Sequence, residues 1–181
     1  MSLGSRPLLS HMGIFVRDLP RMERFYTQVF GLFVTDRGVG KTFRNELVFL
    51  SGTPEQHHQL VLSGGRAADT PSTVMQLSFK VGTLEQLRSL KAAAAALGGS
   101  DMIGLNHGNA WSVYFNDPEQ NRIEIYMDTP FHRPQPCGEP LDIDKSEDEL
   151  CSETMKLIAG LKGSKSRDEY VAEMTKLLST P

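Results

Sequence analysis

The side chains best suited to chemistry in this sequence are histidines and one glutamate in strand-like segments. His11 opens an apolar segment, and His58 opens another after a second histidine, His57. Glu124 lies between two isoleucines, so on a strand its carboxylate faces either water or a site. Imidazole and carboxylate groups bind divalent metals and transfer protons near neutral pH. These residues therefore indicate a metal site or an acid–base site.

An internal repeat relates these residues to one another. Residues 11–19 align without a gap to residues 76–84, and each segment leads into a helical pattern. The alignment pairs His11 with Gln76. A similar offset pairs His58 with Glu124 in the last strand of each half. We expect a two-fold relation between the halves to bring these four side chains into one concavity.

The elements that must position these residues follow the order β-α-β-β-β in each half. The first half is predicted as residues 8–66, with strand-like segments at 11–19, 32–36, 46–50 and 58–62. The second is predicted as residues 74–130, with strand-like segments at 76–84, 102–105, 111–115 and 122–127. Residues 131–181 form a proline-rich segment and two helices, the first with a capping box at Ser146 and Glu149. The expected class is α+β with a mixed sheet.

Composition excludes several other functions. The chain has 181 residues, 39% of them apolar, and 19 basic against 22 acidic residues give a net charge of −3. That balance provides no electrostatic surface for nucleic acid or an anionic membrane. Two cysteines cannot build a disulfide framework, and no apolar run could span a bilayer. We expect a cytoplasmic protein.

Two longer motifs carry a resemblance to a known family. They are Leu9-Ser10-His11-Met12-Gly13-Ile14-Phe15-Val16-Arg17-Asp18-Leu19, and Asn106-His107-Gly108-Asn109-Ala110-Trp111 running on to Tyr114-Phe115-Asn116-Asp117-Pro118. Together with Ile123-Glu124-Ile125-Tyr126, they resemble the vicinal oxygen chelate superfamily over residues 8–130. That superfamily includes glyoxalases, extradiol dioxygenases and bleomycin-resistance proteins. The resemblance implies two βαβββ modules forming a U-shaped sheet around one divalent metal, and a homodimer.

Within that superfamily the sequence is most similar to single-domain extradiol dioxygenases of the 2,3-dihydroxybiphenyl type. The resemblance implies that His11 and Glu124 are ligands of Fe(II), and that a catechol-type substrate and O₂ react there. It also implies that His58 is the catalytic acid–base and that His107 and Tyr114 are proton donors near the substrate. The third ligand in those enzymes is a histidine, whereas this chain has Gln76.

Gln76 leaves two alternatives open. An amide oxygen is a weaker donor than imidazole, although glyoxalase-type members use glutamine at this position. With His58 as an additional ligand, Zn²⁺, Ni²⁺ or Mn²⁺ would act as a Lewis acid for isomerase or lyase chemistry. A third possibility is a non-catalytic ligand-binding protein. We expect that class to lack most of the metal-binding set, which this chain keeps.

Overall fold

The fold was determined as a computed structural model that describes residues 7–42 and 44–179. Each half of the chain has the expected order of elements. The first comprises β1 (Met12–Val16), α1 (Leu19–Phe30), β2 (Phe33–Val39), β3 (Glu46–Ser51) and β4 (Leu60–Gly64). The second comprises β5 (Leu77–Lys80), α2 (Leu84–Ala96), β6 (Ser100–Asn106), β7 (Ala110–Asn116) and β8 (Arg122–Asp128). The predicted α+β class is confirmed, and β2 extends three residues beyond its predicted end.

Local signals explain where the helices begin and end. The Asp18 carboxylate accepts from the Arg21 amide at the start of α1, and Gly31 ends that helix with a φ of 66°. A left-handed backbone suits glycine because it has no Cβ. Thr83 caps α2 in the same way through the Gln86 amide.

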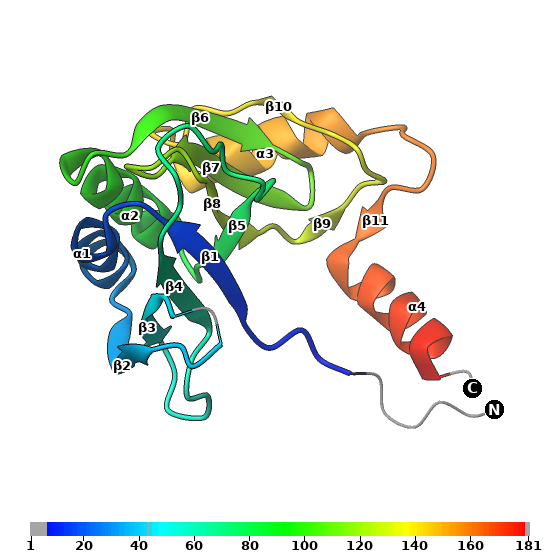
Figure 1. Cartoon of the computed structure of the whole chain (residues 1–181). Helices are drawn as coiled ribbons and strands as arrows, with labels where there is room; N and C mark the ends of the chain where they lie inside the picture. Colours follow the sequence, from blue (N-terminus) through cyan, green and yellow to red (C-terminus); the bar gives the residue numbers. More distant parts are fainter. Residues whose placement is uncertain (1–6, 43, 180–181) are drawn as a thin grey trace.

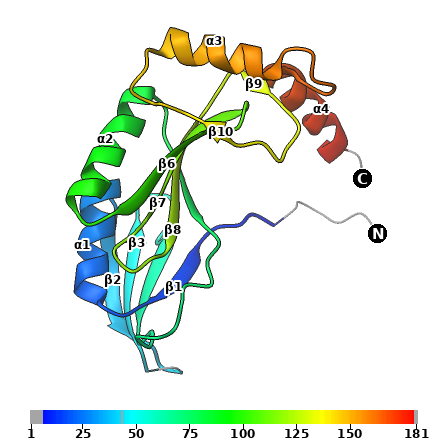
Figure 2. The same ribbon diagram turned by 90° about the horizontal axis from the view of Figure 1, so that it is seen from above.

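The strands of the two modules pair into two sheets that share one plan. Their orders are β1-β4-β3-β2 and β10-β6-β7-β8-β5, where β10 (Glu139–Pro140) belongs to the C-terminal segment. The first and last strands of each module pair in parallel, and the other pairs are antiparallel. Helices α1 and α2 lie side by side on the outer face of the two sheets (Figures 1 and 2). The concave faces of both sheets are therefore left uncovered by these two helices.

A polar cluster and a ring stack hold the two modules together. The Glu119 carboxylate accepts from the Arg17 and Asp18 amides at 2.7–2.8 Å and pairs with Arg66 at 3.0 Å. Phe30 of α1 stacks on Phe79 of β5 with 3.8 Å between ring centroids. Because these contacts join residues far apart in sequence, they fix one module against the other.

The C-terminal segment extends from the second module. It contains β9 (Phe131–His132), β10, α3 (Glu147–Ile158), β11 (Lys165–Ser166) and α4 (Arg167–Ser179). The predicted capping box of Ser146 and Glu149 is present at the start of α3. Helix α3 lies against the second module, whereas α4 projects away from the sheets (Figures 1 and 2). No helix within the described ranges is long and apolar enough to cross a membrane.

Candidate metal centre

The carboxylate of Glu124 lies at the centre of a polar group on the concave face of the second sheet. Ile123 and Ile125 are fully buried in the core, so strand alternation directs Glu124 to the opposite face, where it is 7% exposed. Two donors reach each oxygen: Ser112 Oγ (2.8 Å) and the Tyr114 hydroxyl (2.7 Å) at Oε1, and Gln76 Nε2 (2.9 Å) and Ser78 Oγ (2.6 Å) at Oε2. Four donors therefore hold the Glu124 carboxylate in one orientation.

His107 completes this polar group from the turn between β6 and β7. Tyr114 lies opposite Glu124 in the β7–β8 register. The Tyr114 hydroxyl is 3.2 Å from His107 Nε2, which is 4.0 Å from Glu124 Oε1. Burial, followed by the bond to Glu124, raises the pKa of Tyr114 well above its usual value. Tyr114 therefore keeps its proton. We call Gln76, Ser78, His107, Ser112, Tyr114 and Glu124 the carboxylate group.

The other three candidate histidines gather at one end of the first sheet. The His11 and His58 rings are 4.4 Å apart between centroids, and His57 Nδ1 is 3.0 Å from His58 Nδ1. Burial lowers the pKa of His58, and the neighbouring His11 and His57 lower it further. A lowered pKa favours the neutral imidazole, which can bind a metal or accept a proton. We call these three residues the histidine group.

The register corrects one step of the sequence analysis. Met12 pairs with Leu60 in the first module, and its repeat equivalent Leu77 pairs with Ile123 in the second. The equivalent of Glu124 is therefore Val61, which lies one residue after Leu60. His58 precedes β4 in the connection from β3. His58 was paired with Glu124 at an offset of 66 residues, which is three more than the offset of 63 that the register gives between these strands.

The two groups belong to different sheets and do not form one cluster in a single chain. Among residues 7–42 and 44–179, no three His, Cys, Asp or Glu side chains form a group that could hold a metal ion. The donor types suit a divalent cation, since imidazole, amide oxygen and carboxylate are all metal ligands. Within one chain, however, these ligands are not placed together around a single cation. The structure thus brings His11 to His58, and Gln76 to Glu124, as two separate pairs.

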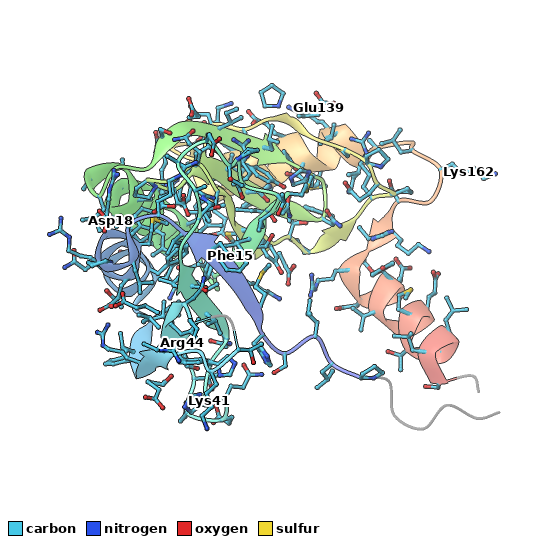
Figure 3. The ribbon with its side chains drawn as sticks, in the orientation of Figure 1. Phe15, Asp18, Lys41, Arg44, Glu139 and Lys162 are labelled. Carbon is cyan, nitrogen blue, oxygen red and sulfur yellow. The ribbon has the colours of Figure 1, made fainter. Side chains whose placement is uncertain are left out.

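Side chains that border the two groups are exposed and apolar. Phe15, 57% exposed, lies on β1 beyond His11 (Figure 3), and Met12 next to His11 is 38% exposed. Met75 precedes Gln76 and is 82% exposed. Ile103, 48% exposed, is paired with Tyr114 across β6 and β7. Exposed apolar residues around polar groups are typical of surfaces that contact a partner or a ligand.

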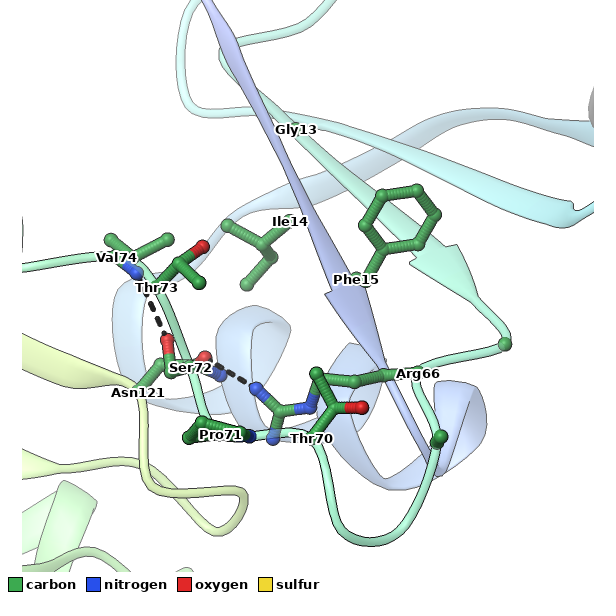
Figure 4. Close-up of a pocket in the computed structure, with 12 residues that line it drawn as sticks. Gly13, Ile14, Phe15, Arg66, Thr70, Pro71, Ser72, Thr73, Val74 and Asn121 are labelled. Carbon is green, nitrogen blue, oxygen red and sulfur yellow. Dashed lines mark hydrogen bonds between the residues drawn. The ribbon is translucent and has the colours of Figure 1, made fainter.

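Two pockets accompany these surfaces. One of about 260 Å³ lies over the carboxylate group and is lined by His107, Asn109, Ala110, Tyr114, Glu124, Tyr126 and Gln135. Another of about 500 Å³ lies between β1 and the connection to β5, and none of the predicted site residues lines it. In this second pocket Arg66 donates to Asn121 at 2.9 Å (Figure 4). Arg66 also pairs with Glu119 between the modules, so its charge is already neutralised.

The sequence did not predict Ser78 and Ser112 of the carboxylate group, nor Asn109, Ala110, Tyr126 and Gln135 of its pocket, as site residues. Ser78 and Ser112 share the concave face with Glu124, and strand alternation could have identified them. Gln135 lines the pocket from the C-terminal segment. No sequence signal places that segment beside His107, because the contact depends on the path of an irregular loop.

Comparisons with known proteins agree with this fold. Biphenyl-2,3-diol 1,2-dioxygenase 3 of Rhodococcus globerulus is 28% identical over 128 residues, which cover 67% of this chain and 64% of that enzyme. The chain thus matches less than two thirds of that relative's length.

Solved structures show the same fold at low sequence identity. A glyoxylase/bleomycin resistance protein/dioxygenase domain from Frankia sp. EAN1pec aligns with a TM-score of 0.58, 23% identity and coverage of 69% of this chain and 100% of that one. The fosfomycin resistance protein FosX of Listeria monocytogenes, solved with Mn(II) and sulfate, aligns with a TM-score of 0.52 and 19% identity. This alignment covers 69% of this chain and 95% of that one. A family model for the Glyoxalase/Bleomycin resistance protein/Dioxygenase superfamily matches residues 8–125, and the chain belongs to that superfamily.

Proposed function

We propose that the protein is a metal-dependent extradiol dioxygenase that cleaves a catechol-type substrate with O₂. The observation that carries the proposal is the carboxylate group beneath a pocket, in which Glu124, Tyr114 and His107 lie within 4.0 Å of one another. Such a set combines a charged ligand with two groups that can exchange protons with a bound diol. The similarity to a biphenyl-2,3-diol dioxygenase supports the choice of substrate class.

His11, Gln76 and Glu124 would hold the metal, with Fe(II) as the preferred ion. Bound Fe(II) would supply redox chemistry with O₂ and an anchor for the two substrate oxygens. Gln76 at present directs its Nε2 toward Glu124. A glutamine binds cations through its amide oxygen, so it must turn to serve as a ligand. Glu124 would then lose its hydrogen bond from Gln76 and bind the cation in its place. The three hydroxyl donors would continue to orient the Glu124 carboxylate.

We further propose that two copies of the chain complete each site. One copy would provide His11 and the other Gln76 and Glu124, because these ligands belong to different sheets within one chain. A two-fold dimer creates two such sites. The exposed apolar residues around both groups would then be covered by the partner.

The protein side chains have distinct roles in this proposal. His58, whose pKa is lowered by partial burial and by the neighbouring His11 and His57, would accept a proton from a substrate hydroxyl. His107 would return a proton to the product, and Tyr114, which keeps its own proton, would donate a hydrogen bond beside it. The buried Ser112 hydroxyl beside Glu124 would keep water from competing for that oxygen of the carboxylate.

Anaerobic reconstitution with Fe(II), followed by exposure of a catechol panel to air, tests the proposal. We expect the yellow ring-fission product from 2,3-dihydroxybiphenyl or a simpler catechol. Gln76→His rebuilds two imidazoles and a carboxylate, so it should increase iron occupancy and turnover. Absence of cleavage by both proteins with iron bound would rule out the dioxygenase activity.

The contact between the His11 and His58 rings favours a second candidate, a lyase or isomerase that uses Zn²⁺, Ni²⁺ or Mn²⁺. His58 would then be a fourth ligand and not a free base. His58→Ala separates the two functions. If His58 is the base, the variant should keep its metal and lose about 10²–10⁴-fold in turnover. Loss of metal from the same variant would favour the four-ligand site.

A further inference from the structure

A loop of the C-terminal segment closes one side of the pocket above the carboxylate group. Gln135 Nε2 donates to the His107 carbonyl at 2.8 Å and to Asn109 Oδ1 at 3.3 Å. Gln135 Oε1 accepts from the Cys137 amide at 2.9 Å. The Cys137 carbonyl in turn bonds to His107 Nδ1. One glutamine side chain therefore links this loop, residues 133–138, to the β6–β7 turn. This loop lies beyond the residues that match the family model.

Contacts made by the residues that follow the loop hold the C-terminal segment in place. The Leu141 amide donates to the Gly104 carbonyl at 3.0 Å, and a Cβ on Gly104 would come within 2.1 Å of the Leu141 carbonyl oxygen. The hydroxyl of Thr154 on α3 accepts from Asn106 Nδ2 and Trp111 Nε1, each at 2.9 Å. Thr154 and Trp111 are almost completely buried. The C-terminal segment thus packs against β6 and β7, and the loop has a defined position over His107.

The pocket beneath this loop presents donors that have no acceptor in the protein. Within residues 7–42 and 44–179, neither Asn109 Nδ2 nor the Tyr126 hydroxyl makes a hydrogen bond, and both residues line the pocket. Asn109 Oδ1 is occupied by Gln135. That bond fixes the orientation of the amide, so Nδ2 is the end left for a ligand. Both residues are partly exposed in the pocket, so a ligand that supplies acceptors can replace solvent at these two donors.

We propose that this pocket is a subsite for an acceptor-bearing substituent, such as a carboxylate, carbonyl or nitro group, on the ring of the substrate. The inference rests on the proposed function, because the ring itself is placed by Glu124, Tyr114 and His107. Asn109 Nδ2 and the Tyr126 hydroxyl bind the substituent. Gln135 is the positioning residue that holds the outer wall and orients Asn109.

Binding of two matched probes tests the subsite. The dissociation constants of 4-nitrocatechol and 4-methylcatechol are measured by anaerobic titration of the Fe(II)-loaded protein and its variants. The ratio of the two constants within one variant cancels any general loss of metal or fold. We expect Tyr126→Phe and Gln135→Ala each to reduce the preference for the nitro compound by about three- to tenfold, since each loses one or two hydrogen bonds. Gln28→Ala, an exposed glutamine on α1, is the matched control and should leave the ratio unchanged.

Gln135→Glu distinguishes two roles of Gln135, which are to hold the loop over the pocket and to orient the Asn109 amide. It keeps the acceptor for the Cys137 amide but removes both Nε2 donors, so the nitro preference should fall while the loop stays closed. Hydrogen exchange of the metal-free protein reports closure directly, and residues 133–138 should exchange faster in Gln135→Ala than in Gln135→Glu. An unchanged ratio in every variant, with catechols still bound, would overturn the subsite alone. Failure of the wild-type protein to bind either catechol would overturn the proposed function as well.

Discussion

At the residue scale, Glu124 is the side chain on which the candidate site depends. Its two oxygens accept four hydrogen bonds, so the carboxylate is held in one orientation before any ligand arrives. Such preorganisation reduces the entropy lost when a cation binds. Glu124 is also the only side chain of the proposed ligand set that carries a negative charge.

Glu124→Gln keeps the shape of this side chain and removes its charge. We expect metal affinity to fall more than tenfold, since loss of even an outer partner of a ligand costs about 10–100-fold. Elemental analysis after dialysis against a defined metal buffer measures the loss. Glu85→Gln, an exposed change on α2, provides the control. Full metal occupancy in Glu124→Gln would place the site elsewhere.

At the element scale, the turn between β7 and β8 connects the two modules through Asp117. Its Oδ1 accepts the Glu119 and Asn121 amides, both at 2.9 Å. Its Oδ2 accepts the Tyr26 hydroxyl at 2.8 Å and Asn121 Nδ2 at 2.7 Å. Asp117 is completely buried. Asp117 thus satisfies the amides of its own turn and also binds that turn to Tyr26 of α1.

Asp117→Asn should destabilise the protein by about 1–3 kcal/mol. An amide presents an NH₂ group to one pair of donors in either orientation, so two buried donors lose their acceptor. Urea unfolding followed by circular dichroism measures the change. Asp69→Asn, exposed in the connection between the modules, should leave the midpoint unchanged. An equal midpoint for Asp117→Asn and wild type would show that these contacts of Asp117 contribute nothing to stability.

The elements also show what sequence could and could not predict. Helix α1 follows from Asp18, Pro20 and Gly31, which are local signals with a local physical cause. The alignment of His58 with Glu124 failed because the connection between β3 and β4 is irregular, and periodicity does not set register through such a segment. Gln135 could not be predicted for a similar reason. Its position depends on the fold of residues 133–138 over another module.

At the scale of the whole molecule, the repeat explains the types of the ligands but not which chain supplies them. His11 and Gln76 occupy equivalent positions at the start of β1 and β5. The repeat therefore predicts a symmetric set of ligands that converges within one chain. In the structure, each half of the set stays on the concave face of its own sheet. The interaction between modules through Phe30, Phe79 and Glu119 fixes that separation.

Two inactive variants test whether a second copy closes the site. His11→Ala and Glu124→Gln should each lose their metal as purified proteins. After subunit exchange, half of randomly paired dimers are mixed, and each mixed dimer has one site with both ligands intact if the site spans two copies. The mixture should then regain about a quarter of the wild-type metal content and of any turnover. If each site lies within one chain, every site in the mixture carries one substitution and no metal returns. A mixture of His11→Ala with Gln76→Ala should behave like the first pair, whereas Gln76→Ala with Glu124→Gln should not recover, because both changes fall on the same side of the site.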